Sequence, residues 1–387
     1  MKKFAVIMLL LLFVPLAAYA FGAEEIIGSQ MESREISDLS IALDKVKRND
    51  FGEIIPDFNL KSAARSVAGG GWEWDIPSIM KRATNFFFKE LFASMRIMAS
   101  LVLLALFSAL SENLRQSFGK DGIGNASFFA CFFLIASFAV RAFLGSLSAA
   151  QAVIDDITVF ITALIPTTLT LLATSGAVIS AGIFHPVLTL CVEVVSLSVR
   201  NVIIPLILIS TALSLANGIS EKAGVGRLAK IFKTAVKWIL GIMLTVFAGV
   251  VAIQSLAAPA LDGISVKTAR FAVGNFVPVV GNVLAESVDL AFGCGAIIKN
   301  AVGVSGLIAI LSICAAPLLR LLSQAFMLSL TAAVIEPVSD ERIAGIISET
   351  GEAVMTLFVT VLIITFMFII NIAIIVGAGN TATVFGR

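Results

Sequence analysis

Long apolar segments follow one another along most of this chain, and they constrain its fold more than any other feature. Only α-helices and closed barrels satisfy every backbone hydrogen bond in lipid. These segments are too long and too evenly apolar for barrel strands, and 58% of the residues are hydrophobic against 14% charged. The sequence therefore predicts an all-α, polytopic transmembrane helical bundle of about eight to ten spans. The predicted spans are Leu91–Leu110, Ala126–Leu147, Ile157–Ala173, Gly176–Leu197, Val202–Ile219, Trp238–Leu256, Ala301–Leu319, Leu321–Pro337 and Ala353–Gly377, with Phe271–Ile298 as a tenth, broken candidate.

The first 20 residues have the pattern of a signal peptide. Lys2 and Lys3 supply the positive end, the run Phe4–Leu16 is apolar, and Ala18 and Ala20 flank Tyr19 in a small-x-small cleavage pattern. The alternative is an uncleaved first transmembrane helix, but the apolar run is shorter than the about 20 residues that cross a bilayer. We expect cleavage after residue 20.

Residues 21–90 are more polar, and we expect them outside the cytoplasm. A helix is predicted from Ile36 to Val46, because apolar residues recur there at helical spacing. The segment Ile79–Glu90 mixes phenylalanines with basic residues, which predicts a helix that lies on the membrane surface. Residues 91–387 would then form the transmembrane helical domain.

The charges between the spans predict an orientation. If Leu91 enters the membrane from outside, five crossings place the segment 220–237 in the cytoplasm. Short cytoplasmic loops carry an excess of basic residues, and this segment is basic. Asp155 and Asp156 would lie in an outside loop. The basic residues of 220–237, opposed by Glu221 alone, are Lys222, Arg227, Lys230, Lys233 and Lys237.

The segment Phe271–Ile298 leaves two arrangements open for the remainder of the chain. If it crosses the membrane fully, the C-terminal end lies outside. If it is re-entrant, Arg387 lies inside and the acidic segment 338–352 lies outside, and the charge distribution favours this second arrangement.

Polar residues in the same segment are the first candidates for a functional site. Asn282, Glu286 and Asp289 are spaced so that they share one face of a helix, and Pro278 and Gly281 interrupt the helix just before them. Carboxylates within a membrane usually face a bundle interior or a water-filled cavity. The functional interpretation is a pore or cavity lining, and the alternative is a polar stripe that holds helices together or lies in the outer membrane interface.

A second candidate for pore or cavity lining is Glu193, within the fourth predicted span. Arg141 and Arg200 are possible partners of its carboxylate.

The motifs of common enzymes do not occur in the sequence. It contains no GxxxxGK loop, HExxH or GxSxG pattern, and its single histidine, His185, precedes a proline in an apolar segment. The cysteines lie in apolar segments and form no CxxC pair, so we interpret them as small apolar residues of membrane helices. They are Cys131, Cys191, Cys294 and Cys314. We therefore predict no catalytic, cofactor-binding or metal site, and no enzyme activity.

Several runs of residues resemble the stage III sporulation protein AE family of endospore-forming bacteria. Together with the signal peptide and the polar region before the first span, the resemblance covers essentially the whole chain. The runs are LANGISEKAG (215–224), KWILGIMLTVFAGVVAIQ (237–254), DGISVKTARFAVGNFVPVVG (262–281), IIKNAVGVSG (297–306) and IIVGAGN (374–380).

The resemblance implies a membrane subunit of the channel complex between mother cell and forespore, required for forespore development after engulfment. Members of the family lie in the mother-cell membrane that surrounds the forespore and are described as permease-like. The implied partners are other subunits from the same sporulation operon, including a secretion-type ATPase and intermembrane ring proteins, a forespore-side channel partner, and membrane lipid; no nucleic acid is implied.

Two other functions fit the residues. An independent secondary transporter, or permease, would also use a helical bundle with buried carboxylates. A purely structural anchor would need no functional carboxylates at all. The first would transport a small solute alone in vesicles, and the second would tolerate neutralisation of Glu286 or Asp289.

Overall fold

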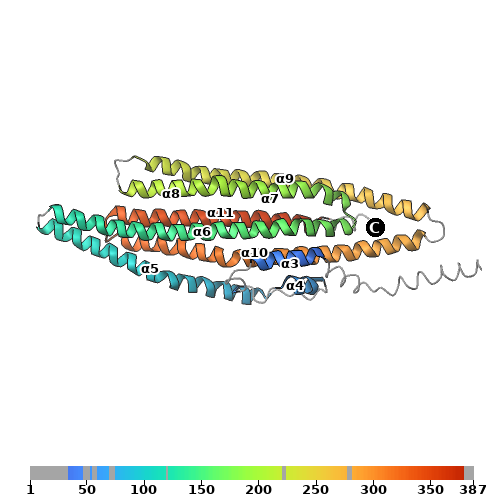
Figure 1. Ribbon diagram of the computed structural model, residues 1–387, viewed down its shortest axis with the longest axis horizontal. Coiled ribbons are helices and arrows are strands. Elements are labelled where there is room, and N and C mark those ends of the chain that lie inside the picture. Colours follow the sequence, from blue (N-terminus) through green and yellow to red (C-terminus); the bar gives the residue numbers. More distant parts are fainter. Residues whose placement is uncertain are drawn as a thin grey trace, which may run out of the picture.

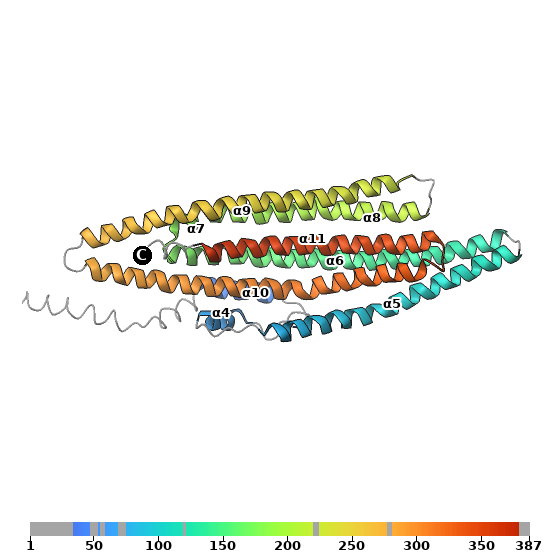
Figure 2. The same ribbon diagram turned by 180° about the vertical axis from the view of Figure 1, so that it is seen from behind.

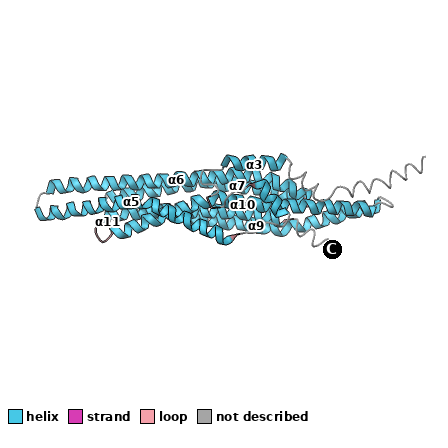
Figure 3. Ribbon diagram, turned by 90° about the horizontal axis from the view of Figure 1, so that it is seen from below, coloured by secondary structure: helices cyan, strands magenta, loops and turns pink. Residues whose placement is uncertain are grey.

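The computed structural model describes residues 34–46, 53–54, 59–68, 75–118, 121–219, 224–276 and 281–378. It describes the backbone alone at 34–35, 112–118, 121–128, 219, 256–261, 263–276 and 281–291. Every regular element within these residues is a helix, as the sequence predicts. Figure 3 shows the helices stacked along one common direction. The predicted signal peptide, residues 1–20, lies outside the described residues.

Two short helices precede the long ones and pack on their sides. The first short helix is α3 (Arg34–Val46), whose apolar residues Ile36, Leu39 and Leu43 are buried, and α3 contacts α6. This confirms the helix that the sequence predicts from residue 36 to 46. The second, α4 (Leu60–Ala68), packs against α10.

The long helices run back and forth along the axis of the molecule (Figures 1 and 2). Each runs antiparallel to the one before it, apart from α7, η1 and α8, which follow one another as a single rod. Their bounds are α5 (Ile76–Phe118), α6 (Asp121–Thr174), α7 (Val178–Ser198), the π-helical turn η1 (Val199–Ile203), α8 (Ile204–Ile219), α9 (Gly226–Phe276), α10 (Gly281–Ile335) and α11 (Glu341–Gly377).

Six helical rods are long and apolar enough to cross a membrane, counted over the part of the chain that the structure describes. The predicted count of about eight to ten spans is therefore wrong. Ala126–Leu147 and Ile157–Ala173 are parts of one helix, α6, and Ala301–Leu319 and Leu321–Pro337 are parts of α10. The physical reason is that a charged residue within an apolar stretch looks like the boundary between two spans, whereas the helix continues through that residue.

The six apolar stretches contain between 30 and 46 residues, whereas about 20 residues cross a 30 Å hydrocarbon core. Stretches of this length must tilt or extend beyond the hydrocarbon layer. The α5–α6 hairpin and the α9–α10 pair extend past the other helices at opposite ends of the bundle (Figure 1). The predicted surface helix Ile79–Glu90 belongs to α5 and continues into the first span without a break.

The centre of the bundle is formed by α10 and α11, which make the most extensive contact of any two helices. In the most apolar stretch of α10, 67% of the residues are buried. In the corresponding stretches of the peripheral helices α5 and α9, 17% are buried. Glycines allow this close packing. A Cβ at Gly303 would lie 2.2 Å from Cγ2 of Val376, and one at Gly306 would lie 2.7 Å from Cδ2 of Leu164.

The segment 271–298 does not cross the bundle as one span. It is divided between the end of α9 at Phe276 and the start of α10 at Gly281, two helices that run in opposite directions. Residues 277–280 lie outside the described residues. The full crossing that the sequence left open is therefore wrong, and the chain reverses direction within this segment.

The ends of the helices define two ends of the bundle. One, which we name the basic end, carries the start of α9 and the turn 336–340 between α10 and α11. The segment 220–237 stays on the side opposite to the start of α5, since three crossings replace the five predicted. The acidic segment 338–352 lies at this same end, which contradicts the arrangement that the charges favoured. Gly377 lies at the opposite end, where α6 meets α7.

Candidate functional site

The residues Asn282, Glu286 and Asp289 belong to the first turns of α10, which begins at Gly281. The backbone of these turns is helical, so the spacing that places the three residues on one face is present. Their side chains lie outside the described residues, so the structure does not place them toward a cavity or toward lipid. The pore-lining interpretation of these residues stays a prediction.

Glu193 lies on α7 with its side chain exposed, two helical turns before Arg200. Of the two predicted partners, Arg200 lies along the same helical rod and close enough to Glu193 for an electrostatic interaction, while its ion pair, at 2.5 Å, is with Asp155 of α6. The Arg200 and Asp155 side chains are 66% and 53% exposed. Asp155 was expected in an outside loop and instead lies within α6, because a partner on the neighbouring helix compensates its charge.

The ion pair lies near the middle of two candidate spans, Phe129–Thr174 and Val178–Gly218. Arg200 belongs to η1, where the α-helical pattern widens to a π-helix, an irregularity that is frequent at functional sites. One turn away, the hydroxyls of Thr158 and Ser196 form a hydrogen bond of 2.8 Å between α6 and α7. Polar groups therefore join these two helices halfway along an apolar region.

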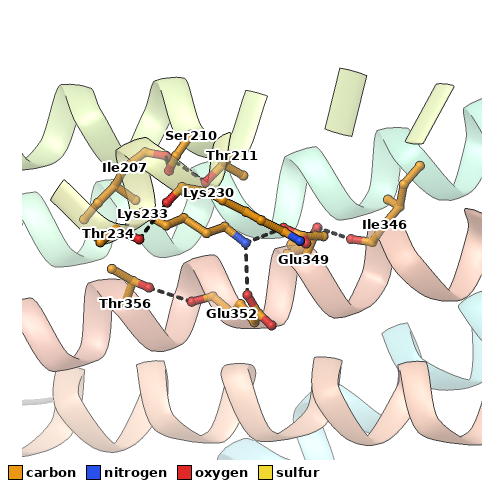
Figure 4. A network of polar contacts seen from close by, with 11 residues as sticks. Ile207, Ser210, Thr211, Lys230, Lys233, Thr234, Ile346, Glu349, Glu352 and Thr356 are labelled. Carbon is orange, nitrogen blue, oxygen red and sulfur yellow. Dashed lines mark hydrogen bonds and ion pairs between the residues drawn. The ribbon is translucent and has the colours of Figure 1, made fainter. Parts of the chain in front are cut away.

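A second charged cluster lies at the basic end (Figure 4). Lys233 of α9 extends toward α11 and donates to Glu349 and, at 2.9 Å, to Glu352. The two glutamates are three residues apart, a spacing that places both on one face of α11. The Lys233 side chain is only 19% exposed. The sequence predicts Lys233 in a basic cytoplasmic segment, and the acidic composition of 338–352 is the signal that could have identified its partners.

A cavity of about 250 Å³ lies beside this cluster, between α8, α9 and α11. Asn217 near the end of α8 accepts a hydrogen bond from the backbone N–H of Gly226 at 3.0 Å and so fixes the start of α9. A Cβ at Gly218 would lie 2.9 Å from Ile346, which shows how closely α8 approaches α11. The charged side chains of the cavity wall are Lys230, Glu341, Arg342 and Glu349.

Two charged residues are buried at the end of the bundle opposite to the basic end. Lys299 of α10 donates to the backbone carbonyls of Val376, at 2.9 Å, and Ala378. A cation at the C-terminal end of a helix is favourable because the last carbonyls carry partial negative charge. Asp262 of α9 accepts from the backbone N–H of Ser180 at 3.1 Å, the equivalent interaction at the start of α7. Neither interaction could be predicted from the sequence, because the partners lie on distant helices and are mostly backbone groups, with the Ser180 hydroxyl as the exception.

The described residues contain no group of three or more His, Cys, Asp or Glu side chains that could hold a metal ion. The four cysteines are free thiols. The arrangement as a whole supplies fixed charges, ion pairs and exposed polar positions on long apolar helices.

Six long apolar helices in alternating directions define the class: this is a multi-pass α-helical membrane protein. The sequence profile of stage III sporulation protein AE matches residues 58–379, and the chain belongs to that family. It is 29% identical over 331 residues to stage III sporulation protein AE of Bacillus subtilis (strain 168), covering 86% of this chain and 83% of the relative. No solved structure matches the fold.

Proposed function

We propose that this protein is a non-enzymatic membrane subunit of the channel that connects mother cell and forespore, in the mother-cell membrane around the forespore. Membership of a stage III sporulation family supports a role in sporulation. The observation that carries the channel role is the exposed ion pair of Asp155 and Arg200 near the middle of two membrane-length helices. Exposing a charged side chain to lipid costs free energy, so such groups face water or another protein.

The dimensions of the bundle also support a subunit of a larger assembly. The apolar stretches are longer than one bilayer requires, and two helical hairpins extend past the other helices at opposite ends (Figure 2). Extended hairpins of this kind offer contact surfaces to proteins on both sides of the membrane. The partners that we propose are the other subunits of the sporulation operon, including the secretion-type ATPase and the intermembrane ring proteins, and the forespore-side channel partner.

The experiment is purification of the tagged, full-length protein from sporulating cells after mild cross-linking. We expect the operon partners to co-purify with it, and a deletion strain to stop development after engulfment. An unrelated multi-pass membrane protein with the same tag is the control. Recovery of the protein alone, together with solute uptake by vesicles that contain only this chain, would establish an independent secondary transporter and reject the channel-subunit role.

A further inference from the structure

The outward surface of the α6–α7 hairpin differs in chemistry from the other exposed surfaces of the bundle. On α6, polar residues recur on the exposed face at Gln151, Asp155, Thr162 and Thr170, interrupted by Val159 and Pro166. The exposed face of α7 and η1 carries a second polar row. Its members are His185, Thr189, Glu193 and Arg200.

The two rows lie side by side along the hairpin. The helices α6 and α7 are antiparallel and joined by a short turn at 175–177, where Gly176 has a φ of 90°. The Asp155–Arg200 ion pair and the Thr158–Ser196 hydrogen bond connect the rows at two successive levels. The result is a largely polar face over residues 151–170 of α6 and 185–200 of α7 and η1, within the two candidate spans.

The exposed surface of α9 is a useful contrast within the same chain. Its outward residues Ile242, Val246 and Ile253 are 58%, 60% and 71% exposed, and between residues 241 and 253 Thr245 is the one exposed polar side chain. Val246 lies at the same level as Val194 of α7, because both line one apolar cavity between the two helices. One chain therefore presents an aliphatic face and a polar face at the same depth, and the aliphatic face suits lipid.

From this contrast we infer that the polar face of α6–α7 is the wall of a hydrated path, a proposal that rests on the channel role. The exposed groups of this face are better satisfied by contact with water than by contact with a tightly packed helix. Asp155 and Arg200 leave more than half of each side chain exposed although they pair with each other. The hydroxyls of Thr162 and Thr170 donate to carbonyls of their own helix, at 2.7 and 2.9 Å, and keep acceptor capacity toward the outside.

The charges on the face indicate the class of solute. The two carboxylates on the outward side of the hairpin, Asp155 and Glu193, are matched by two guanidiniums, those of Arg200 and of Arg141, which is exposed on α6 within the same candidate span. A wall whose fixed charges balance suits small hydrophilic solutes and does not strongly select cations over anions. The passing solute is therefore hydrophilic, and no apolar binding pocket is needed for it.

Cysteine accessibility tests the inference directly. Thr162→Cys and Thr189→Cys place thiols on the polar face without removing a charge, and Val246→Cys and Ile253→Cys are matched controls on the aliphatic face. The reagent is a membrane-impermeant cationic methanethiosulfonate, applied to membrane fragments from sporulating cells that are open on both faces. The unmodified chain, whose own cysteines are buried or half-buried, gives the baseline.

We expect the two polar-face thiols to react at least about tenfold faster than the two controls, because only a hydrated thiol ionises and reacts. Equal, slow rates at all four positions would overturn the inference. So would rapid disulfide formation between copies at Thr189→Cys without modification by the reagent, since that result assigns the face to contact between two copies. Co-purification of the operon partners is measured separately, so the channel role can stand if the hydrated wall fails.

Discussion

Replacing Lys233 by methionine removes the cation that joins α9 to α11 at the basic end. A hydrogen bond to a charged group contributes about 1.5–3 kcal/mol, and that range applies to the contact with Glu349. The Glu352 side chain is 64% exposed, so solvent reduces its contribution to that of a surface pair, below about 1 kcal/mol. We expect Lys233→Met to lower the free energy of unfolding by about 2–3 kcal/mol, most of it through Glu349.

The assay is loss of helical circular dichroism of the purified protein as SDS is added to a mild detergent. A double-mutant cycle with Glu349→Gln should give a coupling free energy of about 1–2 kcal/mol. Lys230→Met, one turn earlier and exposed, is the matched control and should change the free energy of unfolding by less than about 0.5 kcal/mol. A coupling below about 0.3 kcal/mol, or equal effects of the two lysine substitutions, would show that Lys233 does not stabilise the contact between α9 and α11.

Four further predictions follow from the helix packing, the topology and the sequence. Gly303→Ala should destabilise the protein by about 1–3 kcal/mol in the same assay, because its Cβ would lie 2.2 Å from Val376; Gly249→Ala, with no atom within 4 Å, should be neutral or stabilising. Lys230→Cys and Val338→Cys should resist an impermeant thiol reagent added outside intact cells and react in inverted vesicles, and opposite behaviour of the two would contradict the shared basic end. Glu286→Gln with Asp289→Asn should lower spore yield while membrane abundance stays normal, and normal spore yield would reject a functional role for that face. N-terminal sequencing of the membrane protein should start at Phe21, whereas an intact Met1 would show that residues 1–20 are retained.

The all-helical class and the amphipathic helix from residue 36 to 46 could be predicted from the sequence, because both depend on local patterns of apolar residues. Helix length could not be predicted in the same way. Taken alone, Asp155 and Arg200 each look like the end of a span. Their ion pair explains why both helices continue, but the two residues are 45 positions apart in the sequence. Arg320 similarly donates to Glu90 at 3.0 Å from another helix, so α10 continues through it.

Parts of the candidate site could also be predicted from local sequence patterns, and other parts could not. Glu193 was identified because a carboxylate in an apolar segment is unusual, and the structure places it on the exposed polar face of α7. The polar row on α6 was not identified, since threonine and glutamine in a helix gain meaning only when their common exposure is known. The interactions of Lys299 are with backbone carbonyls near the end of α11, and backbone partners leave no residue pattern to detect.

Electron cryo-microscopy of the intact complex, purified from sporulating cells, would show directly whether this chain is a subunit of the channel. We expect density for the six-helix bundle within the complex, with the α6–α7 face and its Asp155–Arg200 pair toward a hydrated passage, and with Val246 of α9 toward lipid. A complex that lacks this chain would rule out the channel role, and a bundle whose α6–α7 face lies against lipid would rule out the hydrated wall.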